Sequence, residues 1–476
     1  MRQLTDRKKQ VMEFMDAMAE RRDRFMRRSA TYHQDLIRLL RYCIPEGSDV
    51  LEIGCGTGHL LASLKPGRGV GIDISAKMLD IARSKYKHLV FVQDDVETMS
   101  LKEKFDQVII CDTLGYLEDI QKAFQQVRKI CHPDTRIIVT YHSFLWQPLL
   151  SLAELLRLKM PQMRLNWLNR EDIENLLLLS GFEVVKRGRR LLLPVFFPVL
   201  SWLINRFFSQ LPLLNRLCLT GYIVARVPRT RPDERDSYSV SVVIPARNEK
   251  GNIEEAVKRC PKMGKHTELI FVEGHSTDGT LDEIKRVCAR KTGRLELRYA
   301  VQDGKGKFDA VRKGFGLAQG DILMILDADL TVPPEELVKF YDAIASGRGE
   351  FINGSRLVYP MEKQSMRILN MAGNKFFSLV FTWLLGQRLK DTLCGTKVLH
   401  RNSWERICRN RHYFGDFDPF GDFDLIFGAS KLNLKIVEVP IRYQARQYGT
   451  TNISRFKHGW LLLRMVFFAI GKIKFL

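Results

Sequence analysis

Residues 51–58 read LEIGCGTG, and this stretch decides which fold the first half of the chain can adopt. The apolar run ending at Ile53 is typical of a buried strand, and the glycines after it permit a tight turn and a close approach of the backbone to a ligand. A helix that begins after such a turn directs its first N–H groups at that ligand. The stretch therefore predicts a strand, a glycine-rich turn and a helix that together hold a cofactor.

The surrounding sequence repeats this alternation of strand and helix. Residues 7–42 have apolar positions at helical spacing and predict one or two amphipathic helices. Further strands are predicted in GVGIDIS, LVFVQDD, FDQVIICD, RIIVTYH and, at 219–227, LTGYIVARV. Strands that alternate with helices predict a doubly wound α/β domain with a parallel sheet.

A polar segment, RTRPDERDSY at 229–238, separates this domain from a second one. After it the strand pattern restarts with SVSVVIPARNE, ELIFVEGHSTDGT, LELRYAVQD and DILMILDADL. A chain of 476 residues is long enough for two or three domains at about 150 residues each. We predict a first α/β domain over 1–228, a linker over 229–238 and a second α/β domain over 239–476.

The composition indicates a folded protein with an anionic partner. Apolar residues make up 45% and charged residues 27% of the chain, and 75 Lys and Arg against 54 Asp and Glu give a net charge of +21. Nucleic acid, anionic lipid and nucleotide phosphates all fit this charge. Nine cysteines without a CxxC pair argue against a disulfide framework or a zinc site, and the start has no apolar signal region, so we expect a cytoplasmic protein.

Three apolar stretches, 191–204, 376–385 and 459–471, have basic flanks. Each is shorter than the roughly 20 apolar residues that span a bilayer. Together they predict helices that lie in the interface of an anionic membrane, so that the protein is peripherally bound to its cytoplasmic face. The alternative is that they are buried core helices.

The strand ends of the first domain carry acidic residues. Asp73 ends the second strand, where a carboxylate can accept hydrogen bonds from both hydroxyls of a ribose. Together with LEIGCGTG, this pattern resembles the class I S-adenosylmethionine-dependent methyltransferases over about residues 25–228. The resemblance implies a Rossmann-like fold that binds S-adenosylmethionine through nine residues: Glu52, Gly54, Cys55, Gly56 and Gly58 at the methionine part, Asp73 at the ribose, Asp95 and Val96 at the adenine, and Asp112 at the sulfonium. The methyl acceptor stays open, because Tyr116 and HPDTR depart from the family pattern.

A second set of carboxylates stands in LDADLT at 326–331, at the end of a predicted strand. Asp327 and Asp329 are separated by one residue, and such hard oxygen ligands select Mg²⁺ or Mn²⁺. An ion at this place would neutralise a departing diphosphate.

The motifs around this pair come in a fixed order: VVIPARNE, EGHSTDGT, DGKGKFDAVRKGF, NGSR, DTLCGTKVLHR and KIVEVPIRYQARQYGTTN. The series resembles the family 2 glycosyltransferases with the GT-A fold, particularly the dolichol-phosphate mannose synthase group, over 239–476. The resemblance implies roles for the following residues: Pro245, Arg247 and Glu249 at the nucleotide, Asp278 at its base or ribose, Lys305 near the phosphates, Asp327 and Asp329 at the metal, Arg356 and Arg367 on the diphosphate, and Asp391 and Asp424 on the acceptor side. Glu273 and Thr331 depart from the family pattern and leave the nucleobase open.

The acceptor of the sugar follows from proton chemistry. A sugar hydroxyl needs a general base, for which Asp424 is a candidate, whereas a polyprenyl phosphate is already anionic and needs only cations such as Arg367, Lys375 and Arg446. We therefore predict a bifunctional, membrane-surface enzyme that moves a sugar from a nucleotide-sugar donor to polyprenyl phosphate with inversion and transfers methyl groups from S-adenosylmethionine.

Two alternatives remain. In the first, the sugar extends a glycan hydroxyl and the other domain methylates that glycan. In the second, the basic N-terminal helices bind nucleic acid for a nucleic-acid methyltransferase. The aromatic residues there, Phe14, Phe25 and Tyr32, do not interleave with the basic residues as stacking platforms do, so no nucleic-acid partner is expected.

Overall fold

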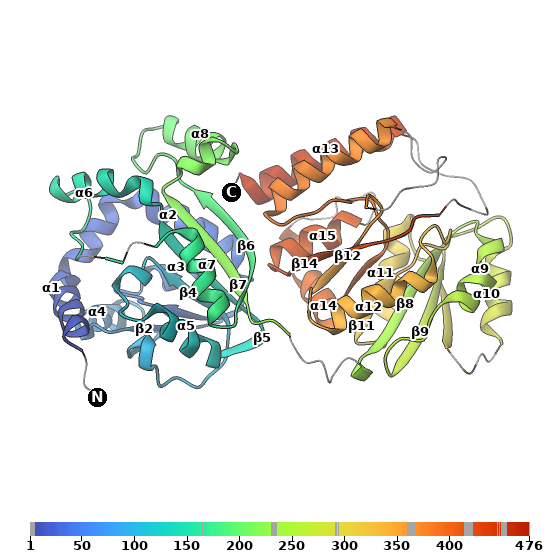
Figure 1. Ribbon diagram of the computed structural model, residues 1–476, viewed down its shortest axis with the longest axis horizontal. Helices are drawn as coiled ribbons and strands as arrows, with labels where there is room; N and C mark the ends of the chain where they lie inside the picture. Colours follow the sequence, from blue (N-terminus) through green and yellow to red (C-terminus); the bar gives the residue numbers. More distant parts are fainter. Residues whose placement is uncertain are drawn as a thin grey trace. The chain divides into compact units, whose positions relative to one another are not determined.

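The computed structural model describes residues 5–163, 165–166, 168–229, 236–290, 293, 295–358, 368–413, 422–444, 446, 448 and 455–475, with the backbone alone for 368–372, 374, 412, 422, 455–459 and 461. Contacts divide the chain into two units, one of Met1–Pro228 with Lys474–Leu476 and one of Arg229–Ile473. Each unit is built on its own seven-stranded sheet (Figure 1).

The first sheet has the strand order β3-β2-β1-β4-β5-β7-β6. Its strands are β1 Asp49–Ile53, β2 Arg68–Asp73, β3 Val90–Gln93, β4 Phe105–Cys111, β5 Cys131–His142, β6 Glu183–Arg190 and β7 Thr220–Arg226. Its helices are α1 Asp6–Arg28, α2 Ala30–Cys43, α3 His59–Leu64, α4 Ala76–Lys85, α5 Ile120–Lys129, α6 Gln147–Leu155, α7 Arg170–Leu179 and α8 Leu200–Arg206. The order reverses at β1, so the carboxyl ends of β1, β2 and β4 converge at the position where doubly wound sheets bind ligands.

The sheet is mixed rather than purely parallel. The strands from β3 to β5 are parallel, whereas β7 pairs antiparallel with both β5 and β6. The apolar pattern of the sequence predicts β7 but not the edge strand β6, whose sequence EVVKRGRR has basic residues where a strand signal needs apolar ones. The apolar stretch 191–204 is also not one helix, because α8 begins only at Leu200. Pro194 and Pro198 lack the N–H donors that a longer helix needs.

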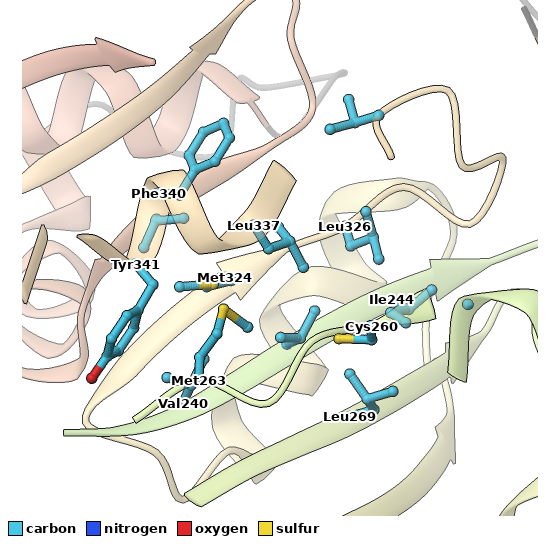
Figure 2. Packing of buried hydrophobic residues seen from close by; sticks show 14 of the residues in the cluster. Val240, Ile244, Cys260, Met263, Leu269, Met324, Leu326, Leu337, Phe340 and Tyr341 are labelled. Carbon is cyan, nitrogen blue, oxygen red and sulfur yellow. The ribbon is translucent and has the colours of Figure 1, made fainter. Parts of the chain in front are cut away.

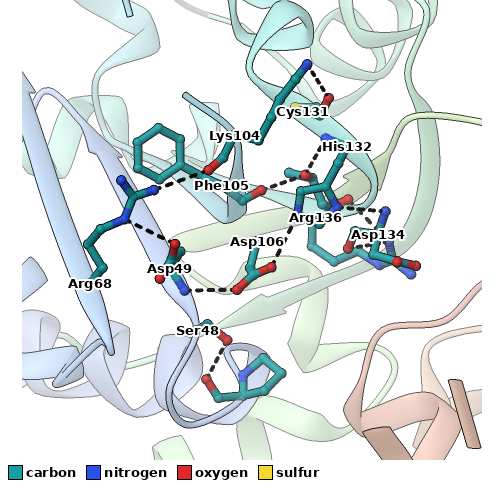
Figure 3. Close-up of polar contacts among 12 residues, drawn as sticks. Ser48, Asp49, Arg68, Lys104, Phe105, Asp106, Cys131, His132, Asp134 and Arg136 are labelled. Atoms are coloured by element: carbon teal, nitrogen blue, oxygen red, sulfur yellow. Dashed lines mark hydrogen bonds and ion pairs between the residues drawn. The ribbon is translucent and has the colours of Figure 1, made fainter. Parts of the chain in front are cut away.

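Polar contacts tie the strands together at the opposite, amino-terminal edge of this sheet (Figure 3). Arg68 Nε at the start of β2 donates to Asp49 at the start of β1 over 3.1 Å. The Asp49 N–H donates to the carboxylate of Asp106 over 3.0 Å, and a ring nitrogen of His132 lies 3.2 Å from the same carboxylate. These contacts fix the relative register of β1, β2, β4 and β5, and thereby the positions of the strand ends that form the site.

The second sheet has the order β10-β9-β8-β11-β13-β12-β14. Its strands are β8 Ser239–Ala246, β9 His266–Glu273, β10 Glu296–Val301, β11 Ile322–Ile325, β12 Phe351–Ser355, β13 Lys397–His400 and β14 Ile436–Pro440. Its helices are α9 Ile253–Arg259, α10 Thr280–Cys288, α11 Lys307–Leu317, α12 Leu337–Ala345, α13 Ile368–Leu385, α14 Arg401–Arg409, α15 Asp422–Lys431 and α16 Arg455–Ala469. Only β13 runs antiparallel to its neighbours β11 and β12, and the order again reverses beside β8.

A continuous apolar core holds the second sheet against α12 (Figure 2). Ile244 and Met324 from the central strands pack with Leu337 and Phe340 of the helix, and all four side chains are fully buried. This core is rigid, because interiors packed to this degree tolerate little displacement. The loops that follow β8 and β11 are therefore anchored on a stable support.

The two apolar stretches of the second domain lie in α13 and α16. These helices pack against each other and bury Phe381 and Met465, while Leu379 and Phe467 are 63% and 70% exposed. They are thus core helices on one side and apolar surface on the other. Among the described residues, none of the helices combines the length and apolarity needed to cross a membrane.

Candidate functional sites

The turn after β1 brings the backbone close to its neighbours. Gly54, Gly56 and Gly58 have φ values of +74°, +52° and +75°, which glycine adopts without strain. A Cβ atom on Gly54 would lie 2.4 Å from Oγ1 of Thr113, and one on Gly56 would lie 2.6 Å from Nε of Arg22. Both positions therefore favour glycine for conformation, and Gly54 also for space, whereas the flexible Arg22 side chain could move away from a Cβ atom on Gly56.

Two carboxylates stand beside this turn. Asp73, at the end of β2, accepts hydrogen bonds from the N–H groups of Gly56 over 2.8 Å and Ser75 over 2.9 Å. Burial raises the pKa of Asp73, although these hydrogen bonds act in the opposite direction. Glu52 is buried and accepts from the Leu61 N–H over 3.0 Å, and burial raises its pKa to about 8. A cationic ligand beside Glu52 would restore the charged form of this carboxylate.

The remaining predicted residues of the first site already have partners. Asp95 accepts from Nζ of Lys8 over 2.6 Å, and Val96 beside it is buried. Asp112 accepts a hydrogen bond from the hydroxyl of Tyr32, and Nε2 of His142 lies 3.8 Å from its Oδ1. The N-terminal helices thus contribute directly to the site.

A single cavity of about 890 Å³ unites these groups. Eight of the nine predicted residues line it: Glu52, Gly54, Cys55, Gly56, Asp73, Asp95, Val96 and Asp112. Gly58 does not, because it caps α3 and packs against Phe91. Lys8, Arg22 and Tyr32 also line the cavity but were not predicted to do so, because helical spacing indicates an amphipathic helix without showing what its polar side faces.

In the second domain, one arginine connects two motifs that are far apart in the sequence. Arg446 donates to Glu249 over 3.0 Å and to Oδ2 of Asp329 over 2.7 Å. Glu249 follows β8 and Asp329 follows β11, and these neighbouring strands are parallel. Burial raises the pKa of Glu249, whereas the charge of Arg446 and the hydrogen bond with Asn252 act to lower it. The carboxyl edge of the sheet therefore gathers the first and last motifs of the series together with LDADLT.

The paired carboxylates of LDADLT differ in their partners. Asp329 accepts from the N–H and hydroxyl of Thr331 over 3.1 and 2.8 Å, while Asp327 pairs with Nζ of Lys307 at 2.5 Å. Leu330, which follows Asp329, has a φ of +50°, a costly conformation for a non-glycine residue and one that clusters at ligand sites. Lys307, rather than the exposed Lys305, is the lysine that reaches the acidic pair.

Gly395 leaves the space that the Asp327 carboxylate occupies. A Cβ atom at this position would lie 2.0 Å from Oδ2 of Asp327 and 2.5 Å from Nζ of Lys307. We expect Gly395→Ala to displace the carboxylate and lower sugar transfer by about 100-fold, because small misplacements of a reacting group have effects of this size. Steady-state assays check this, with Gly316→Ala as the control, since nothing lies near a Cβ there. Wild-type rates in Gly395→Ala would contradict the assigned position of Asp327.

The other predicted donor residues lie along the same edge. Pro245 is in β8, and Arg247 after it is exposed. Asp278 accepts from the N–H groups of Lys250 and Thr280 over 3.3 and 3.0 Å. Burial alone would raise the pKa of Asp278, but these hydrogen bonds lower it overall. The N–H groups of Lys250 and Thr280 thus favour the ionised form of Asp278.

The two residues predicted on the acceptor side, Asp391 and Asp424, are each in an ion pair. Arg356 donates to both oxygens of Asp391, over 2.7 and 2.8 Å, and the Asp391 side chain is fully buried. Asp424 pairs with Nε of Arg411 at 3.0 Å. Arg356, expected on the diphosphate, thus lies against Asp391, and Arg367 lies outside the described residues.

Comparisons with known proteins separate the two halves of the chain. Residues 241–411 match the family model "Glycosyl transferase family 2", and residues 18–187 match the model "Methyltransferase domain". A dolichol-phosphate mannosyltransferase of Pyrococcus furiosus is 35% identical over 221 residues, which cover 45% of this chain and 59% of that protein. An undecaprenyl-phosphate 4-deoxy-4-formamido-L-arabinose transferase of Edwardsiella ictaluri is 26% identical over 224 residues, covering 46% and 64%. The chain thus spans less than two thirds of either relative.

Solved structures similar to the first half include a S-adenosylmethionine-dependent methyltransferase of Thermotoga maritima, with a TM-score of 0.36 and 18% identity over 45% of this chain and 98% of that one. Magnesium protoporphyrin IX methyltransferase of Synechocystis, solved with bound S-adenosylhomocysteine, has a TM-score of 0.35 and 18% identity over 46% of this chain and 99% of that one. By its two family matches, the chain carries a methyltransferase domain followed by a family 2 glycosyltransferase domain.

Proposed function

We propose that the chain is a bifunctional enzyme that transfers a sugar from a nucleotide diphosphate to polyprenyl phosphate and transfers a methyl group from S-adenosylmethionine. The observation that carries the first activity is the meeting of Glu249, Asp329 and Arg446 at one strand edge, although 197 residues separate the first from the last. Acidic and basic groups gathered in this way suit a metal-bound diphosphate. The matched relatives, named as dolichol- and undecaprenyl-phosphate transferases, support a polyprenyl phosphate acceptor.

Asp327 and Asp329 suit a divalent ion that is held jointly by the protein and by the phosphates of the nucleotide-sugar donor. Mg²⁺ is commonly bound by one or two carboxylates together with substrate phosphates, and Asp327 and Asp329 supply two. No group of three potential metal ligands occurs among the described residues, so the donor phosphates would complete the coordination. Lys307 and Arg446, which now pair with the two carboxylates, would then turn to the diphosphate oxygens. A Mg²⁺ or Mn²⁺ ion would supply charge to the leaving diphosphate.

Proton chemistry favours polyprenyl phosphate over a glycan hydroxyl. A hydroxyl acceptor needs a general base. Asp424, the predicted base, pairs with Arg411, and Asp391, the other residue predicted on the acceptor side, pairs with Arg356. Arg356 and other hydrogen bonds lower the pKa of Asp391 despite its burial. Asp391 is therefore a poor base and Asp424 is already held by Arg411, whereas a phosphate oxygen needs no base. The exposed apolar faces of α13 and α16 support contact with the cytoplasmic surface of a membrane, where such a lipid resides.

The cavity of the methyltransferase domain fits S-adenosylmethionine. Glu52 provides a buried carboxylate for a cationic group, and Asp73, which lines the same cavity, would accept hydrogen bonds from the ribose. The sulfonium supplies an activated methyl group, and this chain's residues would bind it and orient the acceptor. Nucleic acid is not among the proposed partners, and a salt-dependent affinity for RNA would be the sign of that alternative.

Asp73→Ala tests the cofactor assignment. The mutation removes a carboxylate that would accept two ribose hydrogen bonds, so we expect S-adenosylmethionine to bind about 100-fold more weakly. Calorimetry on the full chain measures this. Asp80→Ala, which removes an exposed carboxylate in α4, is the matched control and should bind normally. Undiminished affinity in Asp73→Ala would exclude the assignment.

A further inference from the structure

The methyltransferase domain has an apolar surface that its own fold leaves uncovered. Residues 144–158 and 191–217, which we name the apolar rim, include α6 and α8 and lie at the same end of the domain (Figure 1). Leu155, Phe196 and Leu213 are 79%, 73% and 78% exposed. Further leucines, valines and phenylalanines of the rim are at least about half exposed. Many exposed apolar side chains at one end of a domain are typical of a contact with a protein or a membrane.

The charge of the apolar rim is complementary to an anionic membrane. Its only acidic residue is Glu154, which pairs with Lys159 at 2.8 Å. The rim and its edges carry Arg157, Arg206 and Arg216, and the Arg206 guanidinium lies 5.6 Å from the ring centre of Trp202. Aromatic and aliphatic side chains bordered by arginines are the composition of segments that bind in the interface of anionic lipid.

The cavity of the first domain opens at this surface. One part of its wall is formed by Glu52, Gly56 and Asp73, at the proposed cofactor site. Another part is formed by Leu152, Leu156 and Phe196 of the apolar rim, whose side chains are more than half exposed. A molecule that reaches the cavity from a membrane would thus meet lipid-like surface first and the cofactor last.

We infer that the apolar rim lies in an anionic membrane interface and that the methyl acceptor is a hydroxyl-bearing lipid, whose head group enters the cavity while its chain stays in the bilayer. This inference rests on the proposed methyltransferase function and names its substrate class. The sugar-transfer site is not required for it.

A base for such an acceptor is present in the cavity. Tyr32 donates to Asp112, and Nε2 of His142 lies 3.8 Å from the same carboxylate. As the hydroxyl oxygen forms its bond to the methyl carbon, the carbon–sulfur bond breaks and its electron pair stays on sulfur, leaving S-adenosylhomocysteine. The hydroxyl proton passes to His142, and Asp112 stabilises the resulting cation. An acceptor that is already anionic would not need His142 and Asp112 as a general base.

Membrane contact of the apolar rim is tested on the full chain with a local probe. An environment-sensitive fluorophore is attached to Phe196→Cys, or to Leu178→Cys in α7 as the control, after the exposed Cys408 is replaced by serine. Leu178 is 69% exposed but lies outside the rim. Vesicles of phosphatidylcholine with phosphatidylglycerol should shift the emission at position 196 to the blue, and phosphatidylcholine alone should do so less. The same spectrum with and without vesicles at position 196, or an equal shift at 178, would overturn the inference.

The acceptor class is tested with methyl-labelled S-adenosylmethionine and vesicles that contain a chloroform–methanol extract of membranes from the source organism. Label should enter the organic phase, and Leu155→Glu with Leu213→Glu, two exposed rim residues outside the cavity wall, should reduce it at least tenfold while cofactor binding is unchanged. Label confined to an aqueous extract, no label in lipid, or an unaffected double variant would overturn the lipid acceptor. Wild-type protein that fails to bind the cofactor would instead overturn the proposed function itself.

Discussion

Asp329→Asn is expected to lower sugar transfer by about 100- to 1000-fold. The amide removes negative charge from the group that would hold a divalent ion on the donor, where charge develops on the leaving diphosphate. The change is nearly isosteric, and the Asn oxygen can still accept from Thr331, so folding should survive. Initial rates with a nucleotide-sugar donor and polyprenyl phosphate measure the effect.

Two controls separate this effect from a general loss of structure. Asp303→Asn removes a carboxylate that pairs with Lys313 at 2.6 Å but is 83% exposed, and it should leave transfer unchanged. S-adenosylmethionine binding should also persist in Asp329→Asn, because the cofactor would bind in the other domain. A chelator should reproduce the mutation. Transfer at the wild-type rate in Asp329→Asn or in excess chelator would rule out the metal role.

The largest effect on stability is expected from Asp391→Asn. This substitution leaves the Arg356 guanidinium, only 14% exposed, without its bidentate partner in the interior, and removing one member of a buried ion pair costs about 3–5 kcal/mol. The Asp391 side chain also accepts from the N–H groups of Arg356 and Leu393, so the loop before β13 loses its support as well. The free energy of unfolding of the second domain should fall by this amount.

Hydrogen exchange in urea, followed by mass spectrometry of peptides from β12 and β13, reports this change for the second domain alone. Glu335→Gln provides a matched control, because Glu335 accepts two hydrogen bonds from Arg259 with similar distances but is 56% exposed. Loss of this exposed ion pair should lower the free energy of unfolding by less than about 1 kcal/mol. An equal loss of unfolding free energy in both variants would show that burial does not make the Arg356–Asp391 pair more stabilising than an exposed pair.

Local patterns in the sequence were sufficient to predict the two α/β domains and the carboxylates at their strand ends. Asp73 and Asp327 stand at strand ends in the structure because a run of apolar residues fixes where each strand ends, and parallel strands bring these ends to one edge. Such information is contained in about ten neighbouring residues.

The partners of these carboxylates were beyond the reach of sequence patterns. Lys307, Arg446 and Lys8 approach their carboxylates from distant segments, and only tertiary packing determines which lysine or arginine arrives. The NGSR motif predicts Arg356 on the donor diphosphate. A motif carries no information about Asp391, the buried carboxylate that Arg356 contacts. Edge strand β6 was missed for a related reason, since its pairing with β7, and not its composition, makes it a strand.

The most direct test of the proposed glycosyltransferase function is incubation of the full chain with Mg²⁺, membranes containing polyprenyl phosphate and a panel of labelled nucleotide sugars, followed by organic extraction. The account predicts that label from one donor moves into the organic phase and that a chelator or Asp329→Asn prevents it. Label that appears only in water-soluble glycan, with none in the lipid phase, would contradict the polyprenyl phosphate acceptor and favour extension of a glycan hydroxyl.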